Sequence, residues 1–264
     1  MNRSVTLLLW TVLAATALAA ALPDSALSQP YLRGGILLDQ AKDTRLQGSD
    51  CSSTDRLFGC ETGNDIRDGS VVDFESMTGW EVGLGSSILP VLRLELAVQY
   101  RPEFSFEGRA SPDNALLLDL AGEHEVSADL SVWSGLLATY LDISLPLLPF
   151  SPVTPFVGAG GGLSRIEIND LSMESPVASL IVPGDHQVSF SWMLTVGVGV
   201  SLLGWTIDAA WRYTNHGDIE TAAGIGKRIC RIANCELPDL DLPIEPTLGS
   251  LQSEGFTLSL RYSF

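Results

Sequence analysis

The chain has 264 residues, of which 45% are hydrophobic and 18% charged, and its formal net charge is −17. This hydrophobic content excludes a disordered acidic chain, which would have too little apolar surface to form a core. The negative charge argues against nucleic acid as a partner, because phosphate groups would be repelled.

Residues 1–21 have the layout of a secretory signal peptide. Arg3 is followed by an uncharged apolar run from Val5 to Ala21, which ends in Ala-x-Ala cleavage options. A retained membrane anchor and a later cut after Ser28 are the alternatives. Residues 22–264 contain no other stretch of 18 uninterrupted apolar residues, so we expect no transmembrane helix there and a single domain.

From about residue 31 onwards, several segments of the sequence alternate between apolar and polar residues with a period of two, which predicts strands. The last strand is the clearest, because every even position from Phe256 to Phe264 is apolar and every odd position is small or polar. Leu37 interrupts the polar face of the first strand, and the glycine-rich fifth strand has an ambiguous facing. In chain order, we predict eight strands near residues 31–40, 78–88, 92–102, 129–144, 154–166, 187–202, 205–215 and 254–264.

The connections between these strands are alternately short and long. Short links lie near Pro90, at Leu147 to Val153 and at Leu203-Gly204. The others are long, polar and acidic, and we expect them to lack regular structure; they cover residues 41–77, 103–128, 167–186 and 216–252. This rhythm predicts an all-β fold, a single antiparallel up-and-down eight-stranded transmembrane β-barrel with both termini at the short-turn end.

Alternation alone does not say which face of a barrel points inward. A soluble lipocalin-like barrel has apolar residues inside, whereas a membrane barrel has them outside. The polar face here carries charges of both signs among Gly, Ser, Ala and Thr, and aromatic residues lie at strand ends, which favours the membrane barrel. We predict an interior charge network made of Arg33, Glu81, Arg93, Glu95, Arg101, Asp208, Arg212 and Arg261.

Three segments carry a family resemblance: TPFVGAGGG at 154–162, WRYTNHGDI at 211–219 and GFTLSLRYSF at 255–264. With them the chain resembles the small outer-membrane barrels of the opacity-protein and porin-like superfamily of Gram-negative bacteria. The resemblance implies that the last strand, with Tyr262 and Phe264, is the signal read by the barrel-assembly machinery. That family includes adhesins, surface antigens and structural proteins, so the resemblance specifies the fold better than an activity. The first and last loops are long for this family.

Each of these two loops carries a cysteine pair, Cys51 with Cys60 and Cys230 with Cys235. Four cysteines in an exported chain predict two disulfides, formed within each loop or between the loops. A zinc site is disfavoured by the spacing. His216, near Asp218, suggests a lipid-modifying hydrolase, but no serine has the spacing to share an outward patch with it, so we expect it to be a surface histidine without a catalytic role. We therefore expect no enzyme, and no catalytic, cofactor or metal residues.

The sequence thus predicts a monomeric outer-membrane protein with extracellular loops and periplasmic termini. Its expected role is structural or one of surface interaction, through acidic, disulfide-braced loops. The expected partners are membrane lipid and lipopolysaccharide, the assembly machinery and host or cell-surface ligands. A narrow pore for ions or very small solutes is the alternative, and a lipid-A-modifying hydrolase is the third hypothesis.

Overall fold

The computed structural model describes residues 29–48, 70–74, 76–110, 124–143, 152–174, 178–220, 224–230, 240–244 and 246–264. The predicted signal peptide therefore lies outside the described residues. Within them, no helix is long and apolar enough to cross a membrane.

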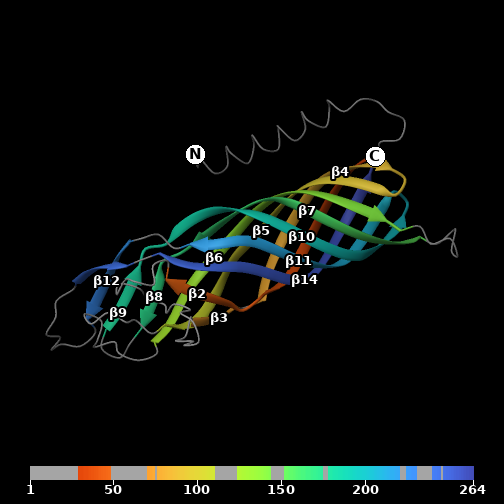
Figure 1. Ribbon diagram of the computed structural model, residues 1–264. Helices are drawn as coiled ribbons and strands as arrows, with labels where there is room; N and C mark the ends of the chain where they lie inside the picture. Colours follow the sequence, from red (N-terminus) through yellow and green to blue (C-terminus); the bar gives the residue numbers. More distant parts are fainter. Residues whose placement is uncertain are drawn as a thin grey trace, which may run out of the picture.

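Eight long strands form a closed antiparallel ring (Figure 1). Each strand pairs with its neighbours in the ring, and the last strand closes the ring by pairing with the first. The prediction of an eight-stranded up-and-down barrel is confirmed. The ring strands, in order, are β1 (Gln29–Ala41), β4 (Ser76–Leu89), β5 (Leu92–Ala110), β6 (His124–Asp142), β7 (Val153–Ile168), β10 (Asp185–Leu202), β11 (Trp205–Glu220) and β14 (Thr247–Ser263).

The register of the ring fixes the tilt of its strands. Following cross-strand partners from Ile36 through β4, β5, β6 and β7 leads to Val188 on β10. The opposite route, through β14 and β11, leads to Val198, ten residues further along the same strand. In an eight-stranded barrel this stagger corresponds to a strand tilt of about 40° and leaves an interior that side chains can fill.

Six short strands extend the barrel wall at the end opposite to the C-terminus (Figure 1). Two of them bridge β14 and β5 beyond the ends of β1 and β4. The other four continue the wall beside β6. We call this part of the molecule the outer tier. The expectation that the long connections lack regular structure is wrong for these segments: β2 (Thr44–Gly48), β3 (Ser70–Phe74), β8 (Leu171–Glu174), β9 (Ala178–Val182), β12 (Gly224–Cys230) and β13 (Leu240–Ile244).

The outer surface of the ring is an apolar belt to which every strand contributes. Its large apolar side chains point away from the barrel, as the facing of Phe256, Leu258 and Leu260 illustrates, with exposed fractions of 66%, 50% and 45%. One residue from each ring strand shows the same facing, with exposures between 42% and 59%: Ile36, Val82, Leu96, Leu137, Leu163, Val196, Ile207 and Leu258.

In the outer tier the facing is reversed, and apolar side chains point inward. Two β-bulges contribute to this change, because one extra residue in a strand moves the following side chains to the other face. One bulge lies in β5 between Arg101 and Phe104, and the other in β11 between Asn215 and Gly217, where Gly217 has a φ of 96°. The resulting apolar core contains Ala41, Phe74, Met77, Phe104, Phe106, Val126, Ala128, Leu130, Val132, Ile166, Ile168, Leu171, Met173, Leu180, Val182, Ile219 and Leu251.

At the opposite end, β10 and β11 are joined by the predicted tight link. Leu203 and Gly204 have φ values of 52° and 84°, so both central residues of the turn are left-handed, as in a type I′ hairpin. Leu203 is 90% exposed.

Candidate functional site in the barrel interior

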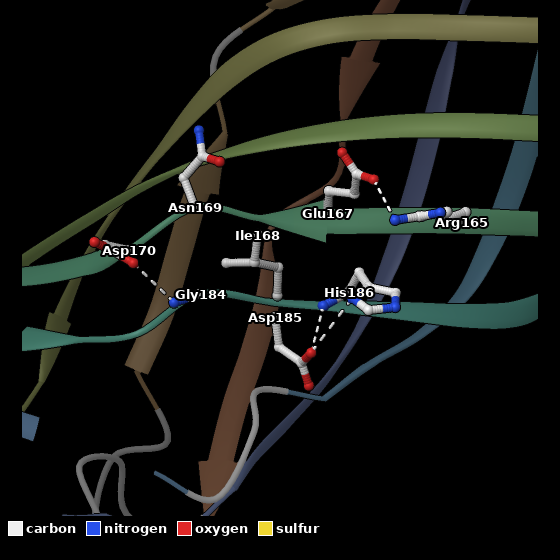
Figure 2. Close-up of a pocket in the computed structure, with 8 residues that line it drawn as sticks. All are labelled: Arg165, Glu167, Ile168, Asn169, Asp170, Gly184, Asp185 and His186. Atoms are coloured by element: carbon white, nitrogen blue, oxygen red, sulfur yellow. Dashed lines mark hydrogen bonds and ion pairs between the residues drawn. The ribbon is translucent and has the colours of Figure 1, made fainter. Parts of the chain in front are cut away.

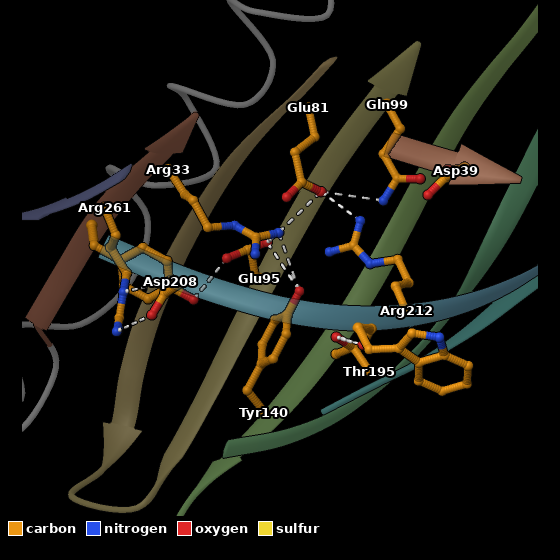
Figure 3. Close-up of polar contacts among 12 residues, drawn as sticks. Arg33, Asp39, Glu81, Glu95, Gln99, Tyr140, Thr195, Asp208, Arg212 and Arg261 are labelled. Atoms are coloured by element: carbon orange, nitrogen blue, oxygen red, sulfur yellow. Dashed lines mark hydrogen bonds and ion pairs between the residues drawn. The ribbon is translucent and has the colours of Figure 1, made fainter. Parts of the chain in front are cut away.

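A cluster of charged side chains occupies the centre of the barrel (Figure 3). The Arg33 guanidinium lies between two carboxylates, 2.6 Å from Glu95 Oε1 and 3.3 Å from Glu81 Oε2. Arg212 Nη1 donates to the same Glu81 oxygen at 2.7 Å. The Tyr140 hydroxyl accepts from Arg33 at 3.2 Å and donates to Glu95 at 3.4 Å. All five side chains are almost fully buried, so the opposite charges compensate one another for the lost hydration.

Further ion pairs lie on either side of this cluster. Towards the outer tier, Arg101 Nη2 is 2.6 Å from Asp39 Oδ2. Its Nη1 donates to Gln99 at 3.1 Å, and Gln99 in turn contacts Glu81 at 3.4 Å, so this pair is joined to the central cluster. Because these partners come from β1, β4 and β5, the network joins separate parts of the wall.

Two bidentate pairs lie towards the short-turn end. Arg93 donates from Nε and Nη2 to Asp142 at 2.7–3.0 Å, and Arg261 donates from the same two nitrogens to Asp208 at 3.2 Å. The Arg93 guanidinium also lies 4.9 Å from the centroid of the Tyr140 ring, a cation–π distance.

The structure places all eight residues of the predicted charge network on the inner face, and each makes an ion pair with another interior residue. Sequence reasoning left out five interior members, among them two carboxylates. With these, the described interior has five guanidinium groups and five carboxylates. Tyr31 and Asp39 lie at odd-numbered positions of β1, as Arg33 does, and this shared parity could have identified them as inward. The omitted members are Tyr31, Asp39, Gln99, Tyr140 and Asp142.

Inward glycines make room for the large side chains of the network. A Cβ on Gly85 would lie 2.4 Å from the Tyr31 ring, and a Cβ on Gly158 would lie 2.5 Å from Tyr140. At these two positions glycine clears the inner face for a bulky neighbour. The small residues of the polar face therefore leave the space that its large Tyr and Arg side chains occupy.

His216 has a serine neighbour, but on the inside of the barrel. His216 Nε2 lies 3.1 Å from Ser253 Oγ on β14, and both residues are at most 1% exposed. His216 Nδ1 has no hydrogen-bond partner among the described residues, so no carboxylate orients the ring. The expectation of a histidine at the surface is wrong, because the alternation that begins at Trp205 still turns position 216 inward.

The residues of the predicted assembly signal lie at the short-turn end of the barrel. Tyr262 and Phe264 are outward and exposed, and the Tyr262 ring lies 4.7 Å from that of Trp205. Cys51, Cys60 and Cys235 lie outside the described residues, and for Cys230 only its backbone at the end of β12 is described. The disulfide pairing therefore stays a prediction.

The interior side chains are suited to blocking the lumen of the barrel. The charge network fills the ring, and the apolar core, with the Phe74 ring 5.9 Å from Phe106 and 6.2 Å from Phe104, fills the outer tier. Among the described residues, no group of His, Cys, Asp and Glu is arranged to hold a metal ion.

Comparison with solved structures finds similarity to proteins of bacterial outer membranes and surfaces. The outer membrane protease OmpT from Escherichia coli matches with a TM-score of 0.52 at 7% identity, covering 92% of this chain and 99% of that chain. The outer membrane protein OprG from Pseudomonas aeruginosa (TM-score 0.49, 15% identity, 90% and 96% covered) and Neisserial surface protein A (0.43, 13%, 89% and 97%) were also found. At 7% identity the likeness to OmpT shows the fold alone, an antiparallel β-barrel. No family model and no curated protein matches the sequence.

Proposed function

We propose that the protein is an integral outer-membrane barrel whose closed interior anchors the outer tier as a surface for interactions outside the membrane. The apolar belt is the observation that carries this proposal. An exposed apolar surface continuous over all eight ring strands would be unstable in water and is matched by lipid. The outward apolar stretches, such as Leu92 to Tyr100 on β5, have the length of about 9–11 residues that a tilted strand needs to cross.

Aromatic side chains support the same placement. Towards the outer tier, Trp80, Tyr100 and Trp133 form one outward cluster, with the Tyr100 and Trp133 rings stacked at 4.2 Å. Trp205 and Tyr262 form a second cluster at the short-turn end. Two such levels are typical of the two membrane interfaces. We infer that the outer tier faces the cell exterior and that the termini and short turns face the periplasm.

The filled interior favours an anchor over a pore. Arg33, Glu81 and Arg212 cross the lumen with side chains at most 3% exposed, and the apolar core lies above them. Purified protein in planar bilayers should therefore show no sustained single-channel steps, under conditions in which a known porin conducts. Sustained steps would support the alternative of a narrow pore.

The position of His216 and Ser253 supports a role without catalysis, because both face the lumen, away from the apolar belt, and are at most 1% exposed. Cells expressing the protein should keep an unchanged lipid-A mass spectrum, and a new lipid-A species absent from a His216→Ala strain would contradict this.

We further propose that the four cysteines form two disulfides that brace the long loops and that the assembly machinery reads the last strand. Peptide mapping with and without reduction tests the disulfides.

A further inference from the structure

A polar pocket lies on the outside of the barrel where β7 gives way to β8 and β9 gives way to β10 (Figure 2). It has a volume of about 590 Å³ and lies at the neck between the ring and the outer tier. We call it the neck pocket. Its lining residues are Arg165, Glu167, Ile168, Asn169, Asp170, Gly184, Asp185 and His186.

The neck pocket begins where the apolar belt ends. Leu163 and Phe190 are cross-strand partners, and so are the next outward pair, Arg165 and Val188. The pair after that is Glu167 with His186, and it is wholly polar. Leu163, Val188 and Phe190 are 59–65% exposed, so an apolar ledge lies directly beside the pocket. A ligand bound at both would have a polar end and an apolar end.

The pocket presents donors and acceptors that are already held in place. Arg165 Nη2 lies 2.7 Å from Glu167 Oε1. Asp170 Oδ1 accepts from the Gly184 N–H at 3.0 Å, and Asp185 Oδ1 accepts from the His186 N–H at 2.7 Å. These bonds fix one oxygen of each carboxylate, and the side chains of Arg165, Glu167, Asp185 and His186 remain 39–62% exposed.

The floor of the pocket is held in place by core packing and backbone hydrogen bonds. Ile168 belongs to the buried apolar core of the outer tier, and the Asn169 N–H donates to the Asp129 carbonyl at 2.8 Å. The two strands stay paired as far as Ile168 with Asp185. Little ordering is therefore required when a ligand binds.

We propose that the neck pocket binds the sugar headgroup of a glycolipid whose acyl chains lie against Leu163, Val188 and Phe190. Sugar hydroxyls both donate and accept, and they match carboxylates beside a guanidinium and an imidazole. A bare phosphate fits less well, because three carboxylates oppose one guanidinium. This inference rests on the proposed membrane location, since it needs the ledge to face lipid.

The test uses full-length protein in nanodiscs of phosphatidylcholine alone or with added diglucosyl diacylglycerol, an uncharged glycolipid, and native mass spectrometry to count retained lipid. Asp185→Asn and Arg165→Ala should each weaken glycolipid retention at least tenfold relative to wild type. Glu107→Gln, an exposed carboxylate on the outward side of β5, is the matched control and should retain it fully.

Each outcome has a defined meaning. Equal retention by wild type and both pocket variants would overturn the proposal, as would equal retention of phosphatidylcholine and glycolipid. Displacement of the glycolipid by the free headgroup sugar at similar concentration would show a site for soluble sugars instead. Heat-modifiable gel migration of the same samples separates the two proposals: protein that shifts but retains no glycolipid contradicts only the pocket, whereas protein that never shifts contradicts the membrane location as well.

Discussion

Arg212 and Glu81 are 131 positions apart in the sequence, and yet their side chains meet at 2.7 Å in the barrel interior. Glu81 also pairs with Arg33, so the loss of one guanidinium leaves a buried charge with fewer partners. Arg212→Met should lower the free energy of unfolding by about 3–5 kcal/mol. Urea titration of protein refolded into lipid vesicles measures this.

The matched control for Arg212 is Arg165→Met. Arg165 also pairs with a carboxylate, Glu167, but its side chain is 50% exposed. Its loss should cost at most about 1 kcal/mol. Similar costs at the two positions would mean that Arg212 is hydrated and that the interior is not closed.

Neighbouring positions on β14 should differ in their tolerance of change. Leu258 points outward and is 50% exposed, whereas Ser259 points inward and is 3% exposed. Leu258→Arg near the middle of the membrane should cost about 2–4 kcal/mol, because a charge then faces lipid. Ser259→Ala should be mild. Equal sensitivity at the two positions would contradict the assigned facing.

The glycines beside the interior tyrosines should not tolerate even substitution by alanine. Gly158→Ala should destabilise the barrel by about 1–3 kcal/mol, because its Cβ would lie 2.5 Å from the Tyr140 ring. Gly34→Ala is the control, since a Cβ there meets nothing within 4 Å. Thermal unfolding followed by circular dichroism in detergent compares the two, and an unchanged midpoint for Gly158→Ala would contradict the packing.

The tight turn between β10 and β11 offers a stabilising change. Leu203 has a φ of 52°, a conformation that is costly for leucine and well tolerated by asparagine. Leu203→Asn should raise the free energy of unfolding by up to about 1 kcal/mol. Leu202→Asn, on the outward face of the adjoining strand, should not stabilise. A loss of stability in Leu203→Asn would show that membrane contact of this leucine outweighs its backbone strain.

The period of two was sufficient to predict the ring, because an apolar outer surface and a polar lumen impose opposite demands on successive residues. Leu37 interrupts the apolar–polar alternation of the sequence, and yet it follows the parity of its strand: it is inward at 0% exposure, whereas Leu38 is outward. The interior charges followed from the same parity.

The outer tier could not be predicted in this way. Its strands β2, β3, β8, β9 and β13 have only four or five residues each, too few for a period to be recognised. Its apolar residues also face inward after the bulges, so the rule that holds in the ring is reversed there. Tyr140 and Asp142 were left out of the network because the inward side of β6 also carries apolar residues such as Leu136, which obscures the alternation on that strand.

Contact between individual leucine methyl groups and lipid tests the central claim most directly. Leu37 and Leu38 are sequence neighbours with exposures of 0% and 52%, and methyl-labelled protein in lipid nanodiscs allows NMR cross-peaks to acyl chains to be assigned to each. We predict cross-peaks to acyl chains from Leu38, as from Leu258, and none from Leu37. Acyl-chain cross-peaks from Leu37 with none from Leu38 would contradict the account.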